Sequence, residues 1–221
     1  MTAASTIAGR VAEMHASMAA EPPDEVMGAF GREQVALAAA GLPDGIAEPG
    51  TSVSDAVLLD VQGAPTTLYA ATGGRPAVLV FYRGVWCPYC NLAVSVYQQH
   101  LIGPLTERGI GLVAISPQTP DGSLSMQQKH GLGFTVVSDP GNTIAGALGI
   151  LTRPSDGARA AQLHLGLDLA TVNADGTITL PMPTVAITDA VHTLRWIDVH
   201  PDYSTRTEPA QILAALDQLS L

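Results

Sequence analysis

The chain has 221 residues, of which 10 are basic and 20 are acidic, so its formal net charge is −10. Hydrophobic residues make up 47% of the chain and charged residues only 14%. This length suits one domain, or one domain with an appendage, and the composition excludes a disordered, collagen-like or coiled-coil protein. Nucleic acid is also excluded as a partner, because binding to phosphate needs a clustered excess of lysine and arginine.

The apolar stretches at 77–82, 109–115 and 144–151 are far shorter than the ~20 residues that span a bilayer. We therefore expect a soluble protein that makes no membrane contact. Residues 1–10 lack the basic region and the apolar run of a secretory signal, so the cytoplasm is the expected location.

The N-terminal part, residues 1–48, reads as a helical extension because it is rich in alanine and carries apolar residues at helical spacing. Pro22 and Pro23 are expected to break its first helix, and Asp24 is expected to cap a second helix that ends near Gly41. These helices either pad the core or form an arm that packs on a second subunit in a homodimer. The apolar positions of the first helix are Ile7, Val11, Met14 and Met18.

Residues 49–221 alternate strand and helix patterns, which indicates an α/β domain. The apolar run at 77–82 is typical of a strand covered on both faces, so we expect it at the centre of the sheet. Pro104 is expected to kink the helix after the cysteines, and residues 153–179 read as a weakly patterned insertion. A hairpin is expected at 57–61 and 66–69, further strands at 111–116, 134–138, 185–188 and 193–199, and further helices at 123–130, 143–148 and from Pro209 onward.

Cys87 and Cys90 are the only cysteines, and they follow the central strand in the segment Phe81-Tyr-Arg-Gly-Val-Trp-Cys-Pro-Tyr-Cys-Asn91. If Pro88 takes the first helical position, Cys87 is the N-cap and Cys90 lies one turn further on. Free backbone N–H groups at the positive helix end then lower the pKa of the exposed thiol. Residues three apart on a helix lie ~5–6 Å from each other, so the pair can close into a disulfide with little backbone movement.

Other uses of the cysteine pair fit the sequence less well. A zinc site needs about four ligands, and the six histidines offer no second ligand pair at usable spacing, so we expect neither a metal nor a cofactor. Two buried structural thiols would need no proline between them. Redox chemistry is therefore the favoured use of the pair. Arg83 either adds positive charge near the thiolate or is an ordinary solvated arginine. Trp86 either shields the pair from solvent or is an ordinary packed aromatic residue.

Three segments give the chain a family resemblance over residues 50–221: the cysteine segment, Val113-Ala-Ile-Ser-Pro-Gln118 and Val136-Val-Ser-Asp139. They resemble the peroxiredoxin-like branch of the alkyl hydroperoxide reductase and thiol-specific antioxidant family, in the thioredoxin-fold superfamily. This implies a thioredoxin-like fold with a central mixed sheet flanked by helices. It also implies that Pro183, followed by Thr184, is a cis proline facing the cysteines. The Pro88-Tyr89 pair between the cysteines is similar to that of glutaredoxins.

The chain departs from the family pattern beside the cysteines. Peroxiredoxins usually carry a proline seven residues and a threonine three residues before the attacking cysteine, whereas counting back from Cys90 gives Arg83 and Cys87. The family's remote arginine is also missing, since Met182 and Pro183 stand in its region. The resemblance thus makes Cys90 the attacking residue, while the helix-end argument favours Cys87. Three further side chains are candidates to approach the pair from later strands or loops: Tyr203, Arg195 and Arg206.

These observations leave three hypotheses for the function. The first is a thiol-dependent peroxidase that reduces hydrogen peroxide or organic hydroperoxides and is recycled by thioredoxin or a similar reductant. The second is a protein disulfide reductase that uses the same cysteine pair on disulfide substrates. The third is a binding protein that keeps the fold without catalysis, for which replacing both cysteines would be harmless.

Overall fold

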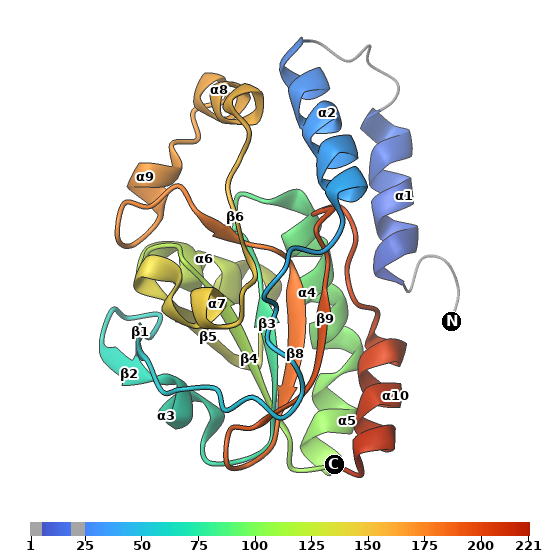
Figure 1. Ribbon diagram of the computed structural model, residues 1–221, viewed down its shortest axis with the longest axis vertical. Helices are drawn as coiled ribbons and strands as arrows, with labels where there is room; N and C mark the ends of the chain where they lie inside the picture. The colour runs from blue at the N-terminus through green and yellow to red at the C-terminus, as the bar shows by residue number, and fades with distance from the viewer. Residues whose placement is uncertain (1–5, 19–24) are drawn as a thin grey trace.

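A computed structural model gives the structure of the protein and describes residues 6–18 and 25–221. Its centre is a seven-stranded mixed sheet with the strand order β2-β1-β5-β4-β3-β8-β9 (Figure 1). Strands β3, β4 and β5 run parallel, while β8 is antiparallel to β3. The strands of this sheet are β1 Val57–Leu59, β2 Pro65–Thr67, β3 Ala77–Phe81, β4 Gly111–Ser116, β5 Thr135–Ser138, β8 Thr184–Thr188 and β9 Leu194–Val199, while β6 Leu151–Thr152 and β7 Leu180–Pro181 pair in a separate two-stranded sheet.

Helices cover both faces of the sheet, and the predicted α/β architecture is confirmed. The helix after the cysteines is interrupted at Leu101, three residues before Pro104, in agreement with the expected kink. The helices are α1 Ile7–Met18, α2 Glu25–Ala40, α3 Leu68–Thr72, α4 Pro88–His100, α5 Ile102–Glu107, α6 Pro120–His130, a 3-10 turn Pro140–Asn142, α7 Thr143–Ala147, α8 Asp156–His164, α9 Leu169–Val172 and α10 Pro209–Leu219.

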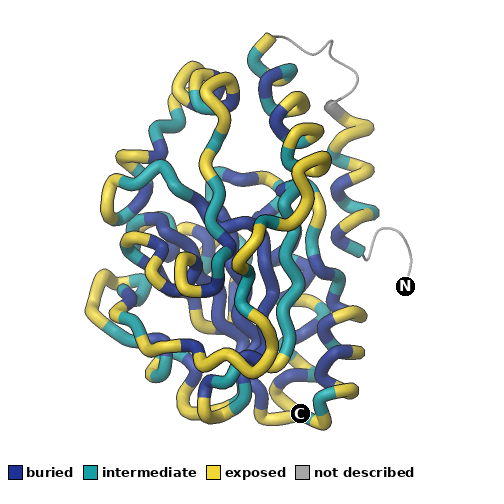
Figure 2. Tube along the Cα trace, viewed as in Figure 1, coloured by how far each residue is buried: buried dark blue, intermediate teal, exposed yellow. Residues whose placement is uncertain are grey.

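Strand β3 lies inside the sheet, between β4 and β8, and all five of its residues are buried. Side chains alternate between the faces of a strand, so Val78 and Val80 enter the core beneath α4, α5, α6 and α10, whereas Leu79 and Phe81 enter the core beneath α3 and α7. Figure 2 shows the resulting band of buried chain through the middle of the molecule. Its continuous apolar run thus reflects burial on both faces.

The N-terminal helices pack on the rest of the same chain. Ile7 and Val11 of α1 are buried in the core beside α4, and α2 packs along α8. The backbone N–H groups of Ile7 and Ala8 donate to the carboxylate of Glu208 at the start of α10, which satisfies free donors at the end of α1. The first helix therefore pads the core of its own chain, and packing of the extension on a second subunit stays a prediction. The predicted break between the helices lies outside the described residues.

Two predicted elements were wrong in part. The hairpin's second strand ends at Thr67, because the Thr67 hydroxyl accepts from Ala70 N–H and caps α3, so Tyr69 is helical. The stretch 153–179 is also not a plain insertion, since Ser155 caps α8 and Asp168 caps α9. Within the described ranges, no helix has the length and apolar character needed to cross a membrane.

Candidate active site

Strand β3 delivers the cysteine pair to the start of α4, as the sequence predicts. Cys87 is the N-cap of α4, Pro88 takes its first turn, and Cys90 follows inside the helix. Both thiols are free, and both residues are buried, with 1% of Cys87 and 0% of Cys90 exposed. The sequence predicts an exposed thiol at the helix end, but neither thiol is exposed. Burial therefore opposes ionisation of both cysteines.

The loop that leads into α4 is fixed by two amide side chains. The Gln118 side chain accepts from Val85 N–H at 2.9 Å and donates to the Tyr82 hydroxyl at 2.8 Å. Asn91 donates to the carbonyl oxygens of Val85 and Cys87, each at 2.7 Å. Because each amide bonds two points of the chain, the loop holds the cysteines in one geometry.

Gly84 is required for this loop to pass beneath the indole of Trp86. Its φ is +154°, and a Cβ at this position would overlap the Trp86 ring nitrogen. We expect Gly84→Ala to lower the free energy of unfolding by about 1–3 kcal/mol, measured by urea denaturation, because the added atom forces strain into a packed site. Gly103→Ala is the control, since a Cβ at Gly103 meets nothing within 4 Å. Equal stability of Gly84→Ala and the wild type would contradict this packing.

Arg206 contacts the sulfur of Cys90. Its Nη2 donates to Cys90 Sγ at 3.1 Å, although the two residues are 116 positions apart in the chain. The other terminal nitrogen donates to the carbonyl oxygens of Tyr203 and Thr205, which fixes the guanidinium in place. The adjacent Thr207 is held as well, because its carbonyl accepts from the Tyr97 hydroxyl at 2.7 Å. A fixed positive charge therefore faces one of the two thiols.

The two cysteines differ in acidity for this reason. Burial opposes ionisation of Cys90, but the hydrogen bond from Cys87 and the charges of Arg206 and Arg83 hold the pKa of the Cys90 thiol well below its ordinary value. Burial raises the pKa of Cys87, and the neighbouring Cys90 raises it further. The geometry thus favours Cys90 as the thiolate and Cys87 as its protonated partner. The helix-end argument for Cys87 did not include burial or Arg206.

Arg83 and Trp86 lie together beside the pair. The Arg83 guanidinium lies 4.0 Å from the ring centre of Tyr203 and 5.2 Å from that of Trp86, distances at which cations interact with aromatic faces. Of the three late candidates, Tyr203 and Arg206 reach the site, whereas Arg195 pairs with Asp189 at the turn between β8 and β9.

Pro183 and Thr184 line a very small cavity, of about 10 Å³, that also borders Cys90 and Arg206. The expectation of a cis proline is wrong, since no peptide bond in the described residues is cis. The chain here is extended: Met182 N–H donates to the Ile150 carbonyl, and the Pro183 carbonyl accepts from His200 N–H. A trans proline suits this straight entry into β8 because the segment needs no N–H at that position.

Cys87 borders a much larger cavity of about 510 Å³, whose walls include residues of α1, α2 and the active-site loop. The N-terminal helices also hold Tyr89, the residue between the cysteines. Its hydroxyl lies 2.9 Å from His15 Nε2 and accepts from Gln34 Nε2 at 3.1 Å. The N-terminal extension therefore forms part of the site, which nothing in the sequence pattern indicated.

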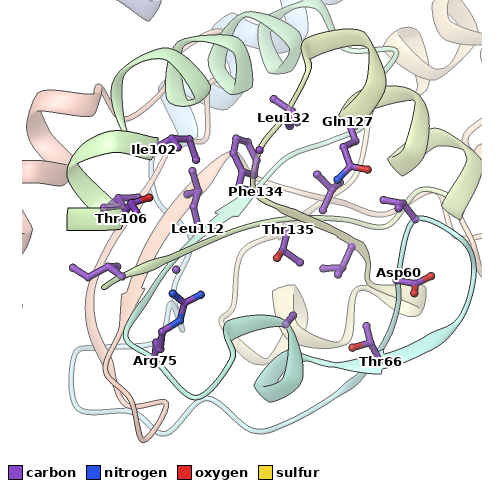
Figure 3. Close-up of a pocket in the computed structure, with 18 residues that line it drawn as sticks. Asp60, Thr66, Arg75, Ile102, Thr106, Leu112, Gln127, Leu132, Phe134 and Thr135 are labelled. Atoms are coloured by element: carbon purple, nitrogen blue, oxygen red, sulfur yellow. The ribbon is translucent and has the colours of Figure 1, made fainter. Parts of the chain in front are cut away.

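A third hollow, of about 620 Å³, lies away from the cysteines, along the residues that precede and begin β4 and β5 (Figure 3). Asp60 on its rim already accepts two backbone N–H groups of its own turn. Its lining contains no cysteine or histidine. The larger volume therefore carries no chemistry comparable to that of the pair.

The sequence profile described as the AhpC/TSA family matches residues 49–197, which is more than half of the chain and includes both cysteines. This chain belongs to the AhpC/TSA family. A protein of Mycobacterium tuberculosis named as a peroxiredoxin is 28% identical over 149 residues, covering 66% of this chain and 92% of the relative. A protein of Coxiella burnetii with a peroxiredoxin name is 25% identical over 116 residues, covering 52% of this chain and 74% of the relative.

The fold of this AhpC/TSA member is similar to that of solved peroxiredoxin structures. Peroxidoxin BcpB from M. tuberculosis has a TM-score of 0.58 at 19% identity and covers 78% of this chain and 96% of its own. Reduced Prx3 from Vibrio vulnificus, solved with hydrogen peroxide, has a TM-score of 0.61 at 16% identity and covers 77% of this chain and 99% of its own. The predicted thioredoxin-like fold is confirmed, and the peroxiredoxin homologues imply thiol peroxidase activity.

The departures of this AhpC/TSA member from the family pattern have structural counterparts. Cys87 stands where the family has a threonine, and its side chain helps to lower the pKa of the Cys90 thiol. Arg206, which contacts Cys90, lies beyond the residues that match the family profile. The sequence indicates only that Arg206 is a candidate to approach the cysteine pair, because no local pattern shows that a distant loop contacts the start of a helix.

Proposed function

We propose that this protein is a thiol peroxidase in which Cys90 attacks the peroxide and Cys87 resolves the product. The observation that carries the proposal is the contact of 3.1 Å between Arg206 and the buried sulfur of Cys90, with a second thiol one helical turn away. A guanidinium at this position stabilises a thiolate and the negative charge that develops on the peroxide oxygen.

The first step is attack of the Cys90 thiolate on the nearer peroxide oxygen. A sulfur–oxygen bond forms and the O–O bond breaks, so sulfur is oxidised to the sulfenic acid and the peroxide is reduced. The departing oxygen takes a proton and leaves as water or an alcohol. The cavity of about 10 Å³ beside Cys90 and Arg206 is barely large enough for one water molecule, so the residues around it must shift for a peroxide to reach the Cys90 sulfur by this route.

The second step joins the two cysteines. The Cys87 sulfur attacks the Cys90 sulfur, the disulfide forms, and the hydroxyl of the sulfenic acid leaves as water with the Cys87 proton. Residues three apart on a helix are ~5–6 Å from each other, a span that a disulfide covers. The second step therefore requires little unfolding of α4.

A thiol reductant then returns the disulfide to the dithiol with two electrons. Peroxiredoxins act with thioredoxin-like reductants, and we extend this to the present protein as thioredoxin or a similar thiol donor. The cytoplasm, where such donors keep thiols reduced, is the compartment we propose.

Protein disulfide reduction through the same pair is the second candidate, favoured by the dithiol at the start of a helix with Pro88 and Tyr89 between the cysteines. Two assays on the reduced protein separate the candidates: stopped-flow oxidation by hydrogen peroxide and by cumene hydroperoxide, and reduction of insulin disulfides. We expect fast oxidation by hydrogen peroxide and slow insulin reduction. Oxidation no faster than that of an ordinary thiol of low pKa, together with fast insulin reduction, would overturn the peroxidase proposal.

A further inference from the structure

The cavity of about 510 Å³ beside Cys87 has the size of a small-molecule site. Figure 1 shows α2 and α8 gathered at one end of the sheet, and residues from α1, α2, the active-site loop and the end of α8 line the cavity. Cys87 is the one cysteine among its lining residues, whereas Cys90 borders the separate small cavity. Much of the wall is apolar, formed by Met14, Met27, Phe30, Leu165 and Leu167.

Arg83 gives this apolar cavity a positive charge, and in the disulfide state no cysteine thiolate is present to offset it. Only 4% of the residue is exposed, and no carboxylate in the described ranges lies within ion-pair distance of its guanidinium. Among these same residues, the Arg83 side chain has no hydrogen-bond acceptor, and both its Nε and the Trp86 ring nitrogen are buried without a partner. A buried guanidinium without an acceptor is costly. An anionic ligand group would remove that cost.

A thiol in the large cavity meets Cys87 rather than Cys90, because Cys87 lines that cavity and Cys90 does not. Once the pair is oxidised to the disulfide, Cys90 is the better leaving group because Arg206 lies 3.1 Å from its sulfur. A thiolate in the cavity therefore bonds to the Cys87 sulfur, the disulfide breaks, and Cys90 leaves as the thiolate. A second thiol then attacks the mixed disulfide, so that two thiols become one disulfide and both cysteines are regained.

We infer that this cavity binds the reductant, and that the reductant is a small thiol with an apolar body and a carboxylate held by Arg83. The inference rests on the proposed function, in which the disulfide forms in every turnover. A protein reductant fits this geometry less well, because Cys87 is 1% exposed and α1 and α2 hold the adjacent Tyr89 through His15 and Gln34. The carboxylate supplies the acceptor that the guanidinium lacks.

Two matched thiols test the inference: 4-mercaptophenylacetic acid and its amide. The protein is oxidised to the disulfide with diamide, and the rate of reduction by each thiol is followed by the fluorescence of the tryptophans. Rates are divided by those for hydroxyethyl disulfide, which corrects for the intrinsic reactivity of each thiol. We expect the acid to be faster than the amide by on the order of ten- to a hundredfold, the range for a charge-assisted hydrogen bond.

The same ratio is measured in three variants. Arg83→Gln is expected to bring the ratio of acid to amide close to one, and Arg83→Lys to keep part of the preference. Arg195→Gln, which removes an arginine that pairs with Asp189 and does not line the cavity, is expected to retain all of it. Because each ratio compares two thiols in one protein, a loss of stability does not imitate the effect.

Three results would overturn the inference: a ratio near one in the wild type, an unchanged ratio in Arg83→Gln, or fast reduction by thioredoxin without any carboxylate preference among small thiols. A carboxylate preference confined to oxidation, with a fatty-acid hydroperoxide faster than its methyl ester, would assign the cavity to the oxidant and overturn it as well. Since diamide forms the disulfide, failure of the peroxidase proposal in the peroxide assay remains distinguishable from failure here.

Discussion

Arg206→Met lowers the rate constant for oxidation by hydrogen peroxide about 10²–10³-fold at pH 7, the usual cost of losing one charge-stabilising donor at a reacting atom. The variant loses the guanidinium that lies 3.1 Å from Cys90 Sγ. Burial of Cys90 then acts with less opposition, and the pKa of its thiol rises. Stopped-flow fluorescence of the reduced protein, as a function of peroxide concentration, measures the effect.

The pH dependence of Arg206→Met separates a charge effect from simple damage to the site. A thiol whose pKa has risen is protonated at pH 7 and ionises as the pH increases, so the deficit relative to the wild type becomes smaller at alkaline pH. Arg206→Lys keeps the charge and is expected to lose less activity. Arg195→Met, whose arginine pairs with Asp189 away from the cysteines, serves as the control. A full-rate Arg206→Met variant would show that Arg206 has no part in the reaction.

Cys90→Ser loses oxidation by peroxide altogether, because it lacks the thiolate that attacks. Cys87→Ser is still oxidised once, since Cys90 and Arg206 remain, but it stops at the sulfenic acid because no thiol forms the disulfide. Dimedone labelling followed by peptide mass spectrometry identifies the oxidised residue in each variant. A sulfenic acid trapped on Cys87 in the Cys90→Ser protein would reverse the two roles.

The sequence predicts the parts of the site that depend on neighbouring residues. The continuous apolar run of β3 requires burial on both faces, and all five residues of the strand are buried. Pro88 suits the first turn of a helix because its missing N–H has no intrahelical partner there, and α4 begins at Pro88 with Cys87 as its cap. The position of the cysteine pair follows from these two local rules.

Contacts between segments that are distant in the chain could not be predicted from the sequence. Arg206 reaches Cys90 only because carbonyl groups of its own loop hold its guanidinium. Without that contact, the dipole of α4 alone determines the expected acidity, and it favours Cys87 at the helix end. The cavity beside Cys87 depends in the same way on the packing of α1 and α2, which helical spacing cannot specify. The relative acidity of the two cysteines therefore depends on tertiary contacts that the sequence does not specify.

The acidity of the two thiols is the property on which the proposed reaction depends. Thiolate absorbance near 240 nm, recorded from pH 4 to pH 10 in Cys87→Ser and in Cys90→Ser, measures each thiol alone. Serine at position 87 keeps a hydroxyl that donates to Cys90. Tyr82 adds little to this absorbance below pH 10, because burial raises the pKa of its phenol to about 12.

We predict that Cys87→Ser keeps its thiolate at pH values well below the ordinary pKa of cysteine, and that Cys90→Ser remains protonated through neutral pH because burial opposes ionisation of Cys87. The opposite pattern, with a thiolate at pH 6 in Cys90→Ser and none in Cys87→Ser, would contradict the assignment of Cys90 as the attacking residue.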